Sequence, residues 1–320
     1  MTSVGIIGGA GYTAGELLRL LIHHPDVEVV TIQSESQAGK SVSDVHSDLI
    51  GLTDLVFVKD IDTSASIYFL CKGHGASAEL LKNHTDLLDK IIIDLSQDFR
   101  LAGSHDFVYG LPELNRTQIK SSRHIANPGC FATCIQLGLL PVVHLDKIQS
   151  DIHISGITGS TGAGQGLSPT THFSWRANNM SVYKAFTHQH LYEIGETIHQ
   201  VNPQFNSKLD FIPYRGNFTR GIIITSYFET DMREDLLKES YDKFYDSHPF
   251  TQVTDVNPDI KMVVNTNRCL VNVRKHNEQA IVISVIDNLL KGASGQAVQN
   301  MNLILGIEET AGLNLKASQF

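Results

Sequence analysis

The sequence predicts an α/β protein with two domains, a doubly wound parallel sheet followed by an α+β domain with a mixed, largely antiparallel sheet. In residues 1–100, short apolar runs alternate with segments of helical period, whereas longer alternating runs prevail after residue 150. The chain has 320 residues, of which 42% are hydrophobic and 18% charged, a length and composition that suit two globular cores.

The N-terminal half reads as strands separated by helices. We expect strands at residues 4–7, 27–32, 66–70 and 90–94, and helices at residues 14–23 and 76–88. Strands that alternate with helices pair in parallel, because each crossing helix returns the chain to the same end of the sheet. The first two strands and the helix between them therefore form one βαβ unit.

The pattern changes after residue 130. We expect helices at residues 131–140, 190–200 and 233–245, and strands at residues 151–158, 221–228, 269–274 and 279–286. The final helical pattern contains GASGQAVQNMNLILGI. We expect a first domain of residues 1–129, a second domain of residues 130–292, and a C-terminal helix at residues 293–320.

Composition narrows the class of protein. A formal net charge of −9 argues against a nucleic-acid-binding surface, although it is compatible with a local positive pocket for an anion. The N-terminus does not read as a secretion signal, and no stretch has the ~18 apolar residues of a membrane span. The sparse cysteines (Cys71, Cys130, Cys134, Cys269) favour a reduced, cytoplasmic protein. The sequence shows no histidine cluster beside them, so it does not predict a metal site.

A glycine-rich segment, GIIGGAGYTAGELL, follows the first strand and opens the first helix. Gly8, Gly11 and Ala14 have the spacing of the dinucleotide-binding fingerprint, in the strand–turn–helix context that it requires. Glycines let the backbone approach a pyrophosphate, and the helix N-terminus offers it free N–H groups. The alternative is a merely tight turn, but the position at the start of a βαβ unit favours cofactor binding.

The end of the second strand, TIQSES, bears on which nicotinamide cofactor is bound. Folds that bind NAD usually place an acidic residue there to hold the ribose 2′-hydroxyl. Ser34 and Ser36 would instead suit a 2′-phosphate, with Lys40 as a charge partner, whereas Glu35 would suit the hydroxyl. These residues prefer NADP and leave NAD open.

Cys130 stands in the segment HIANPGCFAT, where Asn127-Pro128-Gly129 has turn chemistry and a helix follows. At a helix N-terminus, the dipole and the free N–H groups favour a thiolate, and the same N–H groups stabilise an oxyanion. The alternative is a buried structural cysteine, which we accept for the other three. The loop–helix context favours a nucleophile at Cys130.

A nucleophilic cysteine needs a base nearby, often histidine. His188 and His190 flank Gln189 in HQHLYEI, and alternation suggests that their rings point in different directions, so that only one faces Cys130. The alternative is an exposed polar pair. A thiolate beside a nicotinamide suggests that an acyl group forms a thioester, which hydride transfer reduces to an aldehyde. An acyl phosphate would need an anion site, for which the candidates are Ser160, Thr161, Gly162, Arg100, Arg215 and Arg220.

Seven segments, in order along nearly the whole chain, resemble the N-acetyl-γ-glutamyl-phosphate reductase family. They are GGAGYTAGELLRLL, IIIDLSQDFRL, YGLPELN, NPGCFAT, SGITGSTGAGQG, HQHLYEI and IDNLLKGASGQAVQNMN. The resemblance implies a Rossmann domain to which the C-terminal helix at 293–320 returns, and a catalytic domain related to that of glyceraldehyde-3-phosphate dehydrogenase. It also implies a cytoplasmic homodimer or homotetramer. The implied reaction is reduction of N-acetylglutamyl 5-phosphate to the 5-semialdehyde by NADPH, in arginine biosynthesis.

The resemblance also implies roles for individual residues. Cys130 matches the nucleophile, His190 the general acid/base, and His188 a substrate contact, and we expect Asn127 to guide the substrate beside Cys130. Ser160, Arg215 and Arg220 are the expected substrate-binding residues. The cofactor would be held by Gly8, Gly11, Tyr12, Thr13, Ala14, Ser34, Ser36 and Asn288.

Some features depart from the family pattern and keep alternatives open. Ala14 replaces a frequent glycine, Gln165 replaces a usual basic residue, and PYRGNFTRG at residues 213–221 is a variant of the family's Pro…Arg-Gly pattern. The last two bear on the acyl tail, so an N-succinyl substrate is an alternative to N-acetyl. Two further alternatives are an aspartate-semialdehyde dehydrogenase, whose motif lacks the Pro-Gly spacer, and a non-catalytic NAD(P)-binding redox sensor.

Overall fold

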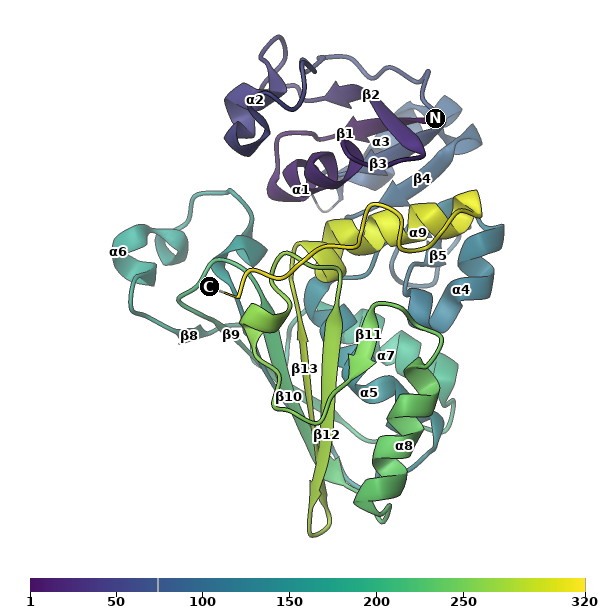
Figure 1. Cartoon of the computed structure of the whole chain (residues 1–320), viewed down its shortest axis with the longest axis vertical. Coiled ribbons are helices and arrows are strands. Elements are labelled where there is room, and N and C mark those ends of the chain that lie inside the picture. The colour runs from purple at the N-terminus through teal and green to yellow at the C-terminus, as the bar shows by residue number, and fades with distance from the viewer. Residues whose placement is uncertain (74, 320) are drawn as a thin grey trace. The chain divides into compact units, whose positions relative to one another are not determined.

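A computed structural model of the chain describes residues 1–73 and 75–319 (Figure 1). The chain divides into two compact units. Unit 1 comprises Met1–Pro128 and Ala293–Asn314, and unit 2 comprises Gly129–Gly292 and Leu315–Phe320, of which Phe320 lies outside the described residues. Among the described helices, none has the length and apolar character needed to cross a bilayer.

Unit 1 contains a parallel sheet with strand order β2-β1-β3-β4-β6-β5. Its strands are β1 (Thr2–Ile7), β2 (Val27–Gln33), β3 (Ile67–Leu70), β4 (Ile91–Asp94), β5 (Val108–Tyr109) and β6 (His124–Ala126). Its helices are α1 (Tyr12–Leu21), α2 (Val42–Val45), α3 (Ala76–Asn83), α4 (Pro112–Ser121) and α9 (Gly295–Leu305). Because β2 and β3 lie on opposite sides of β1, the winding reverses there, which confirms the predicted doubly wound sheet.

The central strands of unit 1 are buried on both faces, as parallel strands covered by helices usually are. All four residues of β3 are buried, and Tyr68 and Leu70 form one core cluster with Leu80 and Leu81 of α3. Helix α9 packs against α1 and α4. A segment from the C-terminal part of the chain therefore completes the first core.

Unit 2 contains a mixed sheet with strand order β11-β12-β13-β10-β7-β9-β8, in which only β7–β9 and β11–β12 pair in parallel. Its strands are β7 (Ile152–Thr158), β8 (Ser181–Val182), β9 (Leu209–Arg215), β10 (Ile222–Glu229), β11 (Thr251–Val253), β12 (Cys269–His276) and β13 (Gln279–Ile286). Its helices are α5 (Cys130–His144), α6 (Phe173–Arg176), α7 (His190–Val201) and α8 (Glu234–Tyr245). The expected mixed, largely antiparallel sheet is confirmed.

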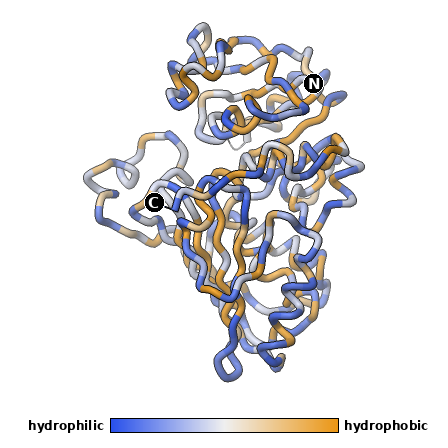
Figure 2. The backbone as a smooth tube through the Cα atoms, in the orientation of Figure 1, coloured by the Kyte–Doolittle hydropathy of each residue, from blue (hydrophilic) through white to orange (hydrophobic). Residues whose placement is uncertain are grey.

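Helix α5 is the central helix of unit 2, and it packs on β10 and β13 between α7 and α8. Residues 131–143 are all buried, and Figure 2 shows that hydrophobic residues also follow the central strands. Pro141 lacks the N–H that would bond the carbonyl of Leu137. The Tyr245 hydroxyl of α8 donates to that carbonyl at 2.5 Å, which satisfies it inside the core.

The opposite face of this sheet is open. Along β10, buried residues alternate with Ile223, Thr225 and Tyr227, and Tyr227 faces Ile281 of β13 across the pair. Tyr227 and Ile281 are exposed although both are largely apolar. A shallow hollow on this face is lined by Ser155, Ile157, Met180, Tyr214, Ile223 and Thr225. We call these residues, with Tyr227 and Ile281, the open sheet face.

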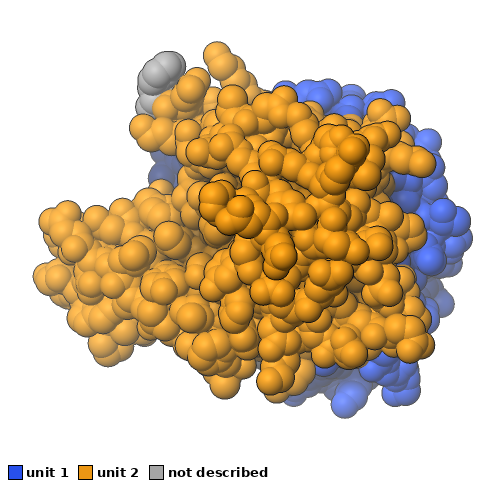
Figure 3. Space-filling view, turned by 90° about the horizontal axis from the view of Figure 1, so that it is seen from below, with its two compact units in different colours: residues 1–128, 293–314 blue, residues 129–292, 315–320 orange. Residues whose placement is uncertain are grey.

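The C-terminal helix is shorter than expected. Helix α9 ends at Leu305 because Gly306 adopts a left-handed conformation (φ +66°), and the Ile307 N–H bonds the carbonyl of Asn302 in a Schellman motif. Residues after Asn314 group with unit 2, where Ser318 bonds Val264 and Asn265 (Figure 3). The expected helix over residues 293–320 is therefore wrong beyond residue 305.

Candidate active site

The glycine loop of unit 1 lies at the carboxyl ends of β1 and β3, where the winding reverses. Gly8 has φ +85°, and a Cβ there would lie 2.8 Å from the Cys71 carbonyl oxygen, so only glycine fits. A Cβ on Gly9 would lie 2.3 Å from Ile32. The backbone is thus pressed against β2 and β3, which brings the start of α1 to the sheet edge where doubly wound folds bind nucleotides.

Helix α1 begins at Tyr12 with Gly11 as its N-cap. No side chain caps this end, no acidic residue lies in the first turn, and a Cβ on Gly11 would meet nothing within 4 Å. The N–H groups of the first turn are therefore available to an anion. Tyr12 is exposed, and Ala14 is fully buried, as a packing position requires. These residues fit a dinucleotide pyrophosphate.

The end of β2 carries the residues expected to contact the ribose. Ser34 is buried, and its N–H bonds the Val58 carbonyl at 3.0 Å, while Ser36 is exposed. Lys40 donates to Gln37 at 3.0 Å. Lys72, which the sequence did not single out, lies 3.8 Å from the Glu35 carboxylate and offsets its charge. Because Lys72 offsets the negative charge of Glu35, this edge of the sheet is more compatible with a 2′-phosphate.

Cys130 is the first residue of α5, with Gly129 as the N-cap in an extended conformation, so the predicted position at a helix N-terminus is confirmed. Cys130 is partly exposed, and no acidic residue lies in the first turn. A Cβ on Gly292 would lie 2.8 Å from the Cys130 Cβ, so that glycine makes room for it. The N-terminus of α5 can therefore support both a thiolate and a developing oxyanion.

His188 and His190 lie together, which contradicts the expectation that they point in different directions. Their ring centroids are 4.6 Å apart, and both rings meet the ring of Phe131, the residue after Cys130. The reason is local conformation: Gln189 between them has helical φ and ψ (−58°, −26°), so the segment is a turn and not an alternating strand. Both imidazoles consequently belong to one cluster.

The two histidines differ in environment. Burial lowers the pKa of His188 to about 4, with further lowering by the nearby positive charges of Lys184 and Arg215. Its Nδ1 accepts the backbone N–H of His190 at 3.3 Å, which places the ring proton on Nε2. His188 is therefore a neutral hydrogen-bond donor at physiological pH and a poor proton acceptor.

Glu193 links His190 to the Cys130 loop, and the sequence did not single it out. The carboxylate is buried, accepts the Gly129 N–H at 3.0 Å, and approaches His190 Nε2 at 3.8 Å. It lies one helical turn after His190, so α7 supplies both groups. Glu193 therefore lies between the imidazole of His190 and the residue that precedes Cys130.

Tyr183 and Arg215 form the basic side of the cluster. The Arg215 guanidinium lies 4.7 Å over the Tyr183 ring, whose centroid is 5.7 Å from that of His188. Burial, with a smaller electrostatic effect from Cys130, raises the pKa of Tyr183 to about 12, so its hydroxyl keeps its proton. The sequence predicted Arg215 but not Tyr183. Arg215 thus places a positive charge beside the histidine cluster, in a chain of net charge −9.

Two of the predicted arginines, Arg220 and Arg100, are hydrogen-bonded to other groups of the protein. Arg220 forms a bidentate ion pair with fully buried Asp287, at 3.1 and 3.2 Å. Arg100, in unit 1, donates to the carbonyl oxygens of Asn127 and Leu95. Asn127 also belongs to unit 1, and its amide donates to the Ala293 carbonyl and accepts from Asn300. These contacts fix the positions of all three side chains.

Ser160, Thr161 and Gly162 form a 3₁₀ turn after β7. This turn lies against residues 216–221, since the N–H of Ser160 bonds the Phe218 carbonyl and that of Thr161 bonds the Thr219 carbonyl. Asn288 secures the arrangement, because its amide oxygen accepts the Gly221 N–H at 2.7 Å and its nitrogen donates to Thr161 at 3.0 Å. Asn288, expected at the cofactor, therefore braces this loop pair in unit 2.

The remaining cysteines are poor nucleophiles, as their structural interpretation requires. Burial raises the pKa of both Cys71 and Cys134 to about 12, and Cys134 donates to Ser284. Cys269 is buried in β12. Within residues 1–73 and 75–319, no group of three or more His, Cys, Asp or Glu side chains is arranged to hold a metal ion.

Two family models match the chain. Residues 3–122 match the NAD binding domain of semialdehyde dehydrogenases, and residues 130–288 match their dimerisation domain. Similar solved structures include an aspartate semialdehyde dehydrogenase II from Vibrio cholerae (17% identity, TM-score 0.74, 96% of this chain and 98% of that one). Another, from Candida albicans with NADP, gives 14% identity and a TM-score of 0.72, over 96% of this chain and 99% of that one. These likenesses confirm the fold.

Curated relatives are much closer in sequence. The chain is 55% identical over 322 residues to a protein of Parabacteroides distasonis, 51% identical over 322 residues to one of Bacteroides thetaiotaomicron, and 51% identical over 325 residues to one of Flavobacterium johnsoniae. Each match covers 100% of both sequences, and each relative is named N-acetyl-gamma-glutamyl-phosphate reductase. The chain therefore belongs to the N-acetyl-gamma-glutamyl-phosphate reductase family, within the semialdehyde dehydrogenases.

Proposed function

We propose that the chain reduces N-acetyl-L-glutamyl 5-phosphate to N-acetyl-L-glutamate 5-semialdehyde and phosphate, with NADPH as the reductant, in arginine biosynthesis in the cytoplasm. The observation that carries the proposal is Cys130 at the start of α5, in one unit with buried His188, His190 and Glu193 and with partly exposed Arg215. Family membership supplies the substrate. NADP(H), bound on the glycine loop of unit 1, would supply the hydride.

The side chains of unit 2 account for the chemistry. The Cys130 thiolate attacks the acyl carbon, the carbon–oxygen bond to phosphate breaks, and a thioester remains on the sulfur. Hydride reaches the thioester carbon, and the carbon–sulfur bond then breaks to release the aldehyde and regenerate the sulfur nucleophile. The N–H groups at the start of α5 stabilise the oxyanion in both halves. Arg215 and Ser160 bind the phosphate or the substrate carboxylate.

Proton transfer is assigned to His190. It accepts the Cys130 thiol proton as the thiolate forms and donates a proton when the sulfur leaves. Glu193 lies 3.8 Å from His190 and accepts the N–H of Gly129, the residue before the nucleophile, so it positions both groups. The low pKa of His188 supports a different role for that residue, as a neutral donor to the substrate.

The chain also acts as a homodimer in this proposal, with the open sheet face of unit 2 as the interface. Partly exposed apolar side chains cover that face, and the domain that carries it matches a dimerisation domain. Burying these side chains against a second copy would remove apolar area from water, which is the main driving force of association.

The test is a coupled assay of the reverse reaction. We expect phosphate-dependent reduction of NADP by N-acetylglutamate 5-semialdehyde, with at least a ~10³-fold loss of turnover in Cys130→Ser. Cys134→Ser removes a buried thiol from the same helix and should retain activity, so it is the matched control. Near-normal activity of Cys130→Ser would refute the mechanism, and faster turnover of the N-succinyl substrate would refute the assigned acyl group.

A further inference from the structure

Residues 164–186, here called the arm, connect the 3₁₀ turn at Ser160 to His188 and project beyond the β8 edge of the unit 2 sheet (Figure 1). The arm contains α6, β8 and an unusual share of exposed apolar side chains. The exposed residues are Leu167, Phe173, Trp175, Met180, Val182 and Phe186. Leu167 is 102% exposed and Phe173 82% exposed, so neither side chain contributes hydrophobic stabilisation to the single chain.

The arm is held in one conformation by Arg176, which is buried. Its guanidinium donates to the carbonyl oxygens of Thr170 and Arg215, at 3.0 and 2.8 Å, and to the Ser181 hydroxyl at 3.3 Å. It also lies 4.8 Å from the centre of the Trp175 ring. One buried cation therefore ties the tip of the arm to β8 and β9, so its apolar residues are presented in a fixed arrangement.

The exit of the arm is strained. Lys184 and Phe186 both have positive φ, 46° and 58°, in a conformation that bulky side chains rarely adopt. The Phe186 N–H bonds the Phe211 carbonyl at 2.9 Å, which fixes the conformation while the ring stays exposed. Such strain persists only where the surroundings enforce it.

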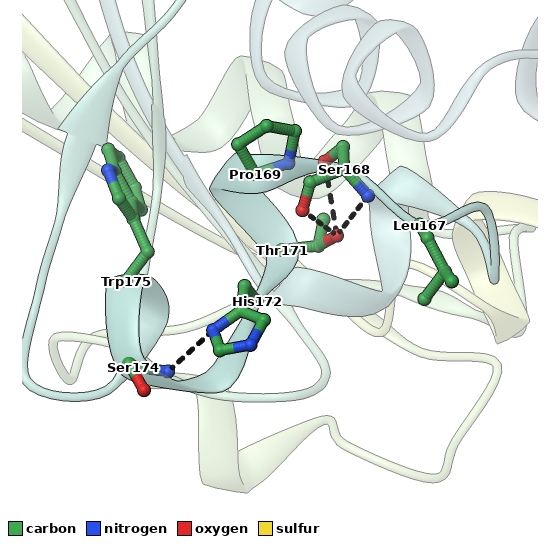
Figure 4. Close-up of a pocket in the computed structure, with 7 residues that line it drawn as sticks. All are labelled: Leu167, Ser168, Pro169, Thr171, His172, Ser174 and Trp175. Atoms are coloured by element: carbon green, nitrogen blue, oxygen red, sulfur yellow. Dashed lines mark hydrogen bonds between the residues drawn. The ribbon is translucent and has the colours of Figure 1, made fainter.

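The tip of the arm is hollowed, as Figure 4 shows. Trp175 and Leu167 stand on opposite sides, and Ser168, Pro169, Thr171, His172 and Ser174 line the space between them. Hydrogen bonds within the turn, including those between Ser168 and Thr171, occupy the polar groups there. The hollow has room for an apolar side chain brought by another surface.

Two observations identify the occupant. The family model of a dimerisation domain covers residues 130–288 and so includes the whole arm. Met180 belongs to the arm and also to the open sheet face, so the two surfaces are continuous. We propose that the arm embraces a second copy of this chain, with Leu167, Phe173 and the hollow at Trp175 packed against it. This inference rests on the proposed dimer.

Trp175 is the only tryptophan in the chain, so the tryptophan fluorescence of the wild-type protein comes from the arm. Sedimentation of the full chain over a dilution series gives the dimer dissociation constant, and tryptophan emission and acrylamide quenching are read on the same samples. We expect the emission to move to shorter wavelength and quenching to weaken as the dimer forms, with the same midpoint as the mass.

Variants locate the contact. Leu167→Asp and Phe173→Asp should each raise the dissociation constant by at least ~30-fold, as loss of an anchoring residue does. Leu236→Asp makes the same change at an exposed site on α8 and should leave the constant within ~2-fold, as expected away from an interface. Circular dichroism of each variant checks that it is folded. The emission series of the wild-type protein tests the same contact without any substitution.

The outcomes separate the arm from the dimer and from the chemistry. If Ile281→Asp on the open sheet face splits the dimer while the arm variants and the Trp175 signal are unaffected, the arm proposal is wrong and the sheet interface stands. A wild-type chain that stays monomeric at all concentrations overturns both. Activity of the same samples, and its loss in Cys130→Ser, tests the proposed reaction independently of either result.

Discussion

The glycine loop of unit 1 and the Cys130 cluster of unit 2 are built in opposite ways. The loop is a contiguous segment in which Gly8 and Gly9 let the backbone pack against β3 and β2, and it leads to the uncapped N-terminus of α1 at Gly11. The Cys130 cluster is made of side chains from four separate segments, held by buried charges. A site made of backbone can be read from a short motif, whereas a site made of dispersed side chains depends on the fold.

The largest effect should come from the ion pair that supports the second site. Arg220→Ala leaves the buried Asp287 carboxylate without its bidentate partner, which should lower the free energy of unfolding by about 3–5 kcal/mol. Arg215→Ala should cost less than about 1 kcal/mol of stability, as a partly exposed cation does, but reduce kcat/KM for the acyl phosphate. Urea unfolding and steady-state kinetics measure both. Equal stability losses would remove the distinction between a structural and a binding arginine.

His188 should make unit 2 sensitive to acid. Its pKa is about 4 in the folded chain and 6.5 as the ordinary value, so the unfolded chain binds the proton first as pH falls. The contribution to stability is complete above pH 6.5, is lost progressively down to pH 4, and amounts to up to ~3 kcal/mol.

Urea titrations between these pH values test this, because His188→Gln should flatten that part of the stability profile. His23→Gln changes an exposed histidine and is the control, expected to leave the slope as in the wild type. A wild-type stability that does not fall between pH 6.5 and 4 would show that His188 is charged in the folded state.

The backbone site is tested by a matched pair of glycines. Gly8→Ala combines a positive φ with a clash against the Cys71 carbonyl, and should cost about 2 kcal/mol of stability without any cofactor. Gly11→Ala meets nothing within 4 Å, so it should change that stability by less than about 0.5 kcal/mol and weaken only NADPH binding. Thermal unfolding with and without NADPH separates the two effects. If both variants bound NADPH as the wild type does, the cofactor would not lie on this loop.

The smallest effect tests the charge of Glu193. In Glu193→Gln, the amide oxygen still accepts the Gly129 N–H, but the negative charge near His190 is lost. We expect kcat to fall about 10-fold with KM little changed, as for a positioning group, and the basic limb of the pH–rate profile to move to lower pH. Glu196→Gln, one turn further along α7, is the control. An unmoved pH profile would leave Glu193 a structural role only.

Short-range signals explain which elements were predictable. The strands at β1, β2, β7, β10, β12 and β13 carry apolar residues in long or regular patterns, and the sequence predicts each of them. Strands β5, β6, β8, β9 and β11 were not predicted. Four of them have only two or three residues, and β9 contains Pro213, which is unusual within a strand. The end of α9 at Leu305 was missed because Gly306, a common stop signal, lies in an otherwise helical pattern.

The sequence by itself determined the fold class, the glycine loop and the position of Cys130, the proposed nucleophile, at a helix start. Each of these depends on contiguous residues: the period of apolar side chains, glycines between a strand and a helix, and Cys130 after Asn-Pro-Gly at a helix start. Only the tertiary structure decided how the other candidates are used. The low pKa of His188 depends on its burial, and the pairing of Arg220 depends on Asp287, which is distant in sequence. The link from Glu193 to the Cys130 loop likewise joins separate segments. A local sequence pattern specifies neither the burial of a side chain nor its contacts with segments distant in sequence.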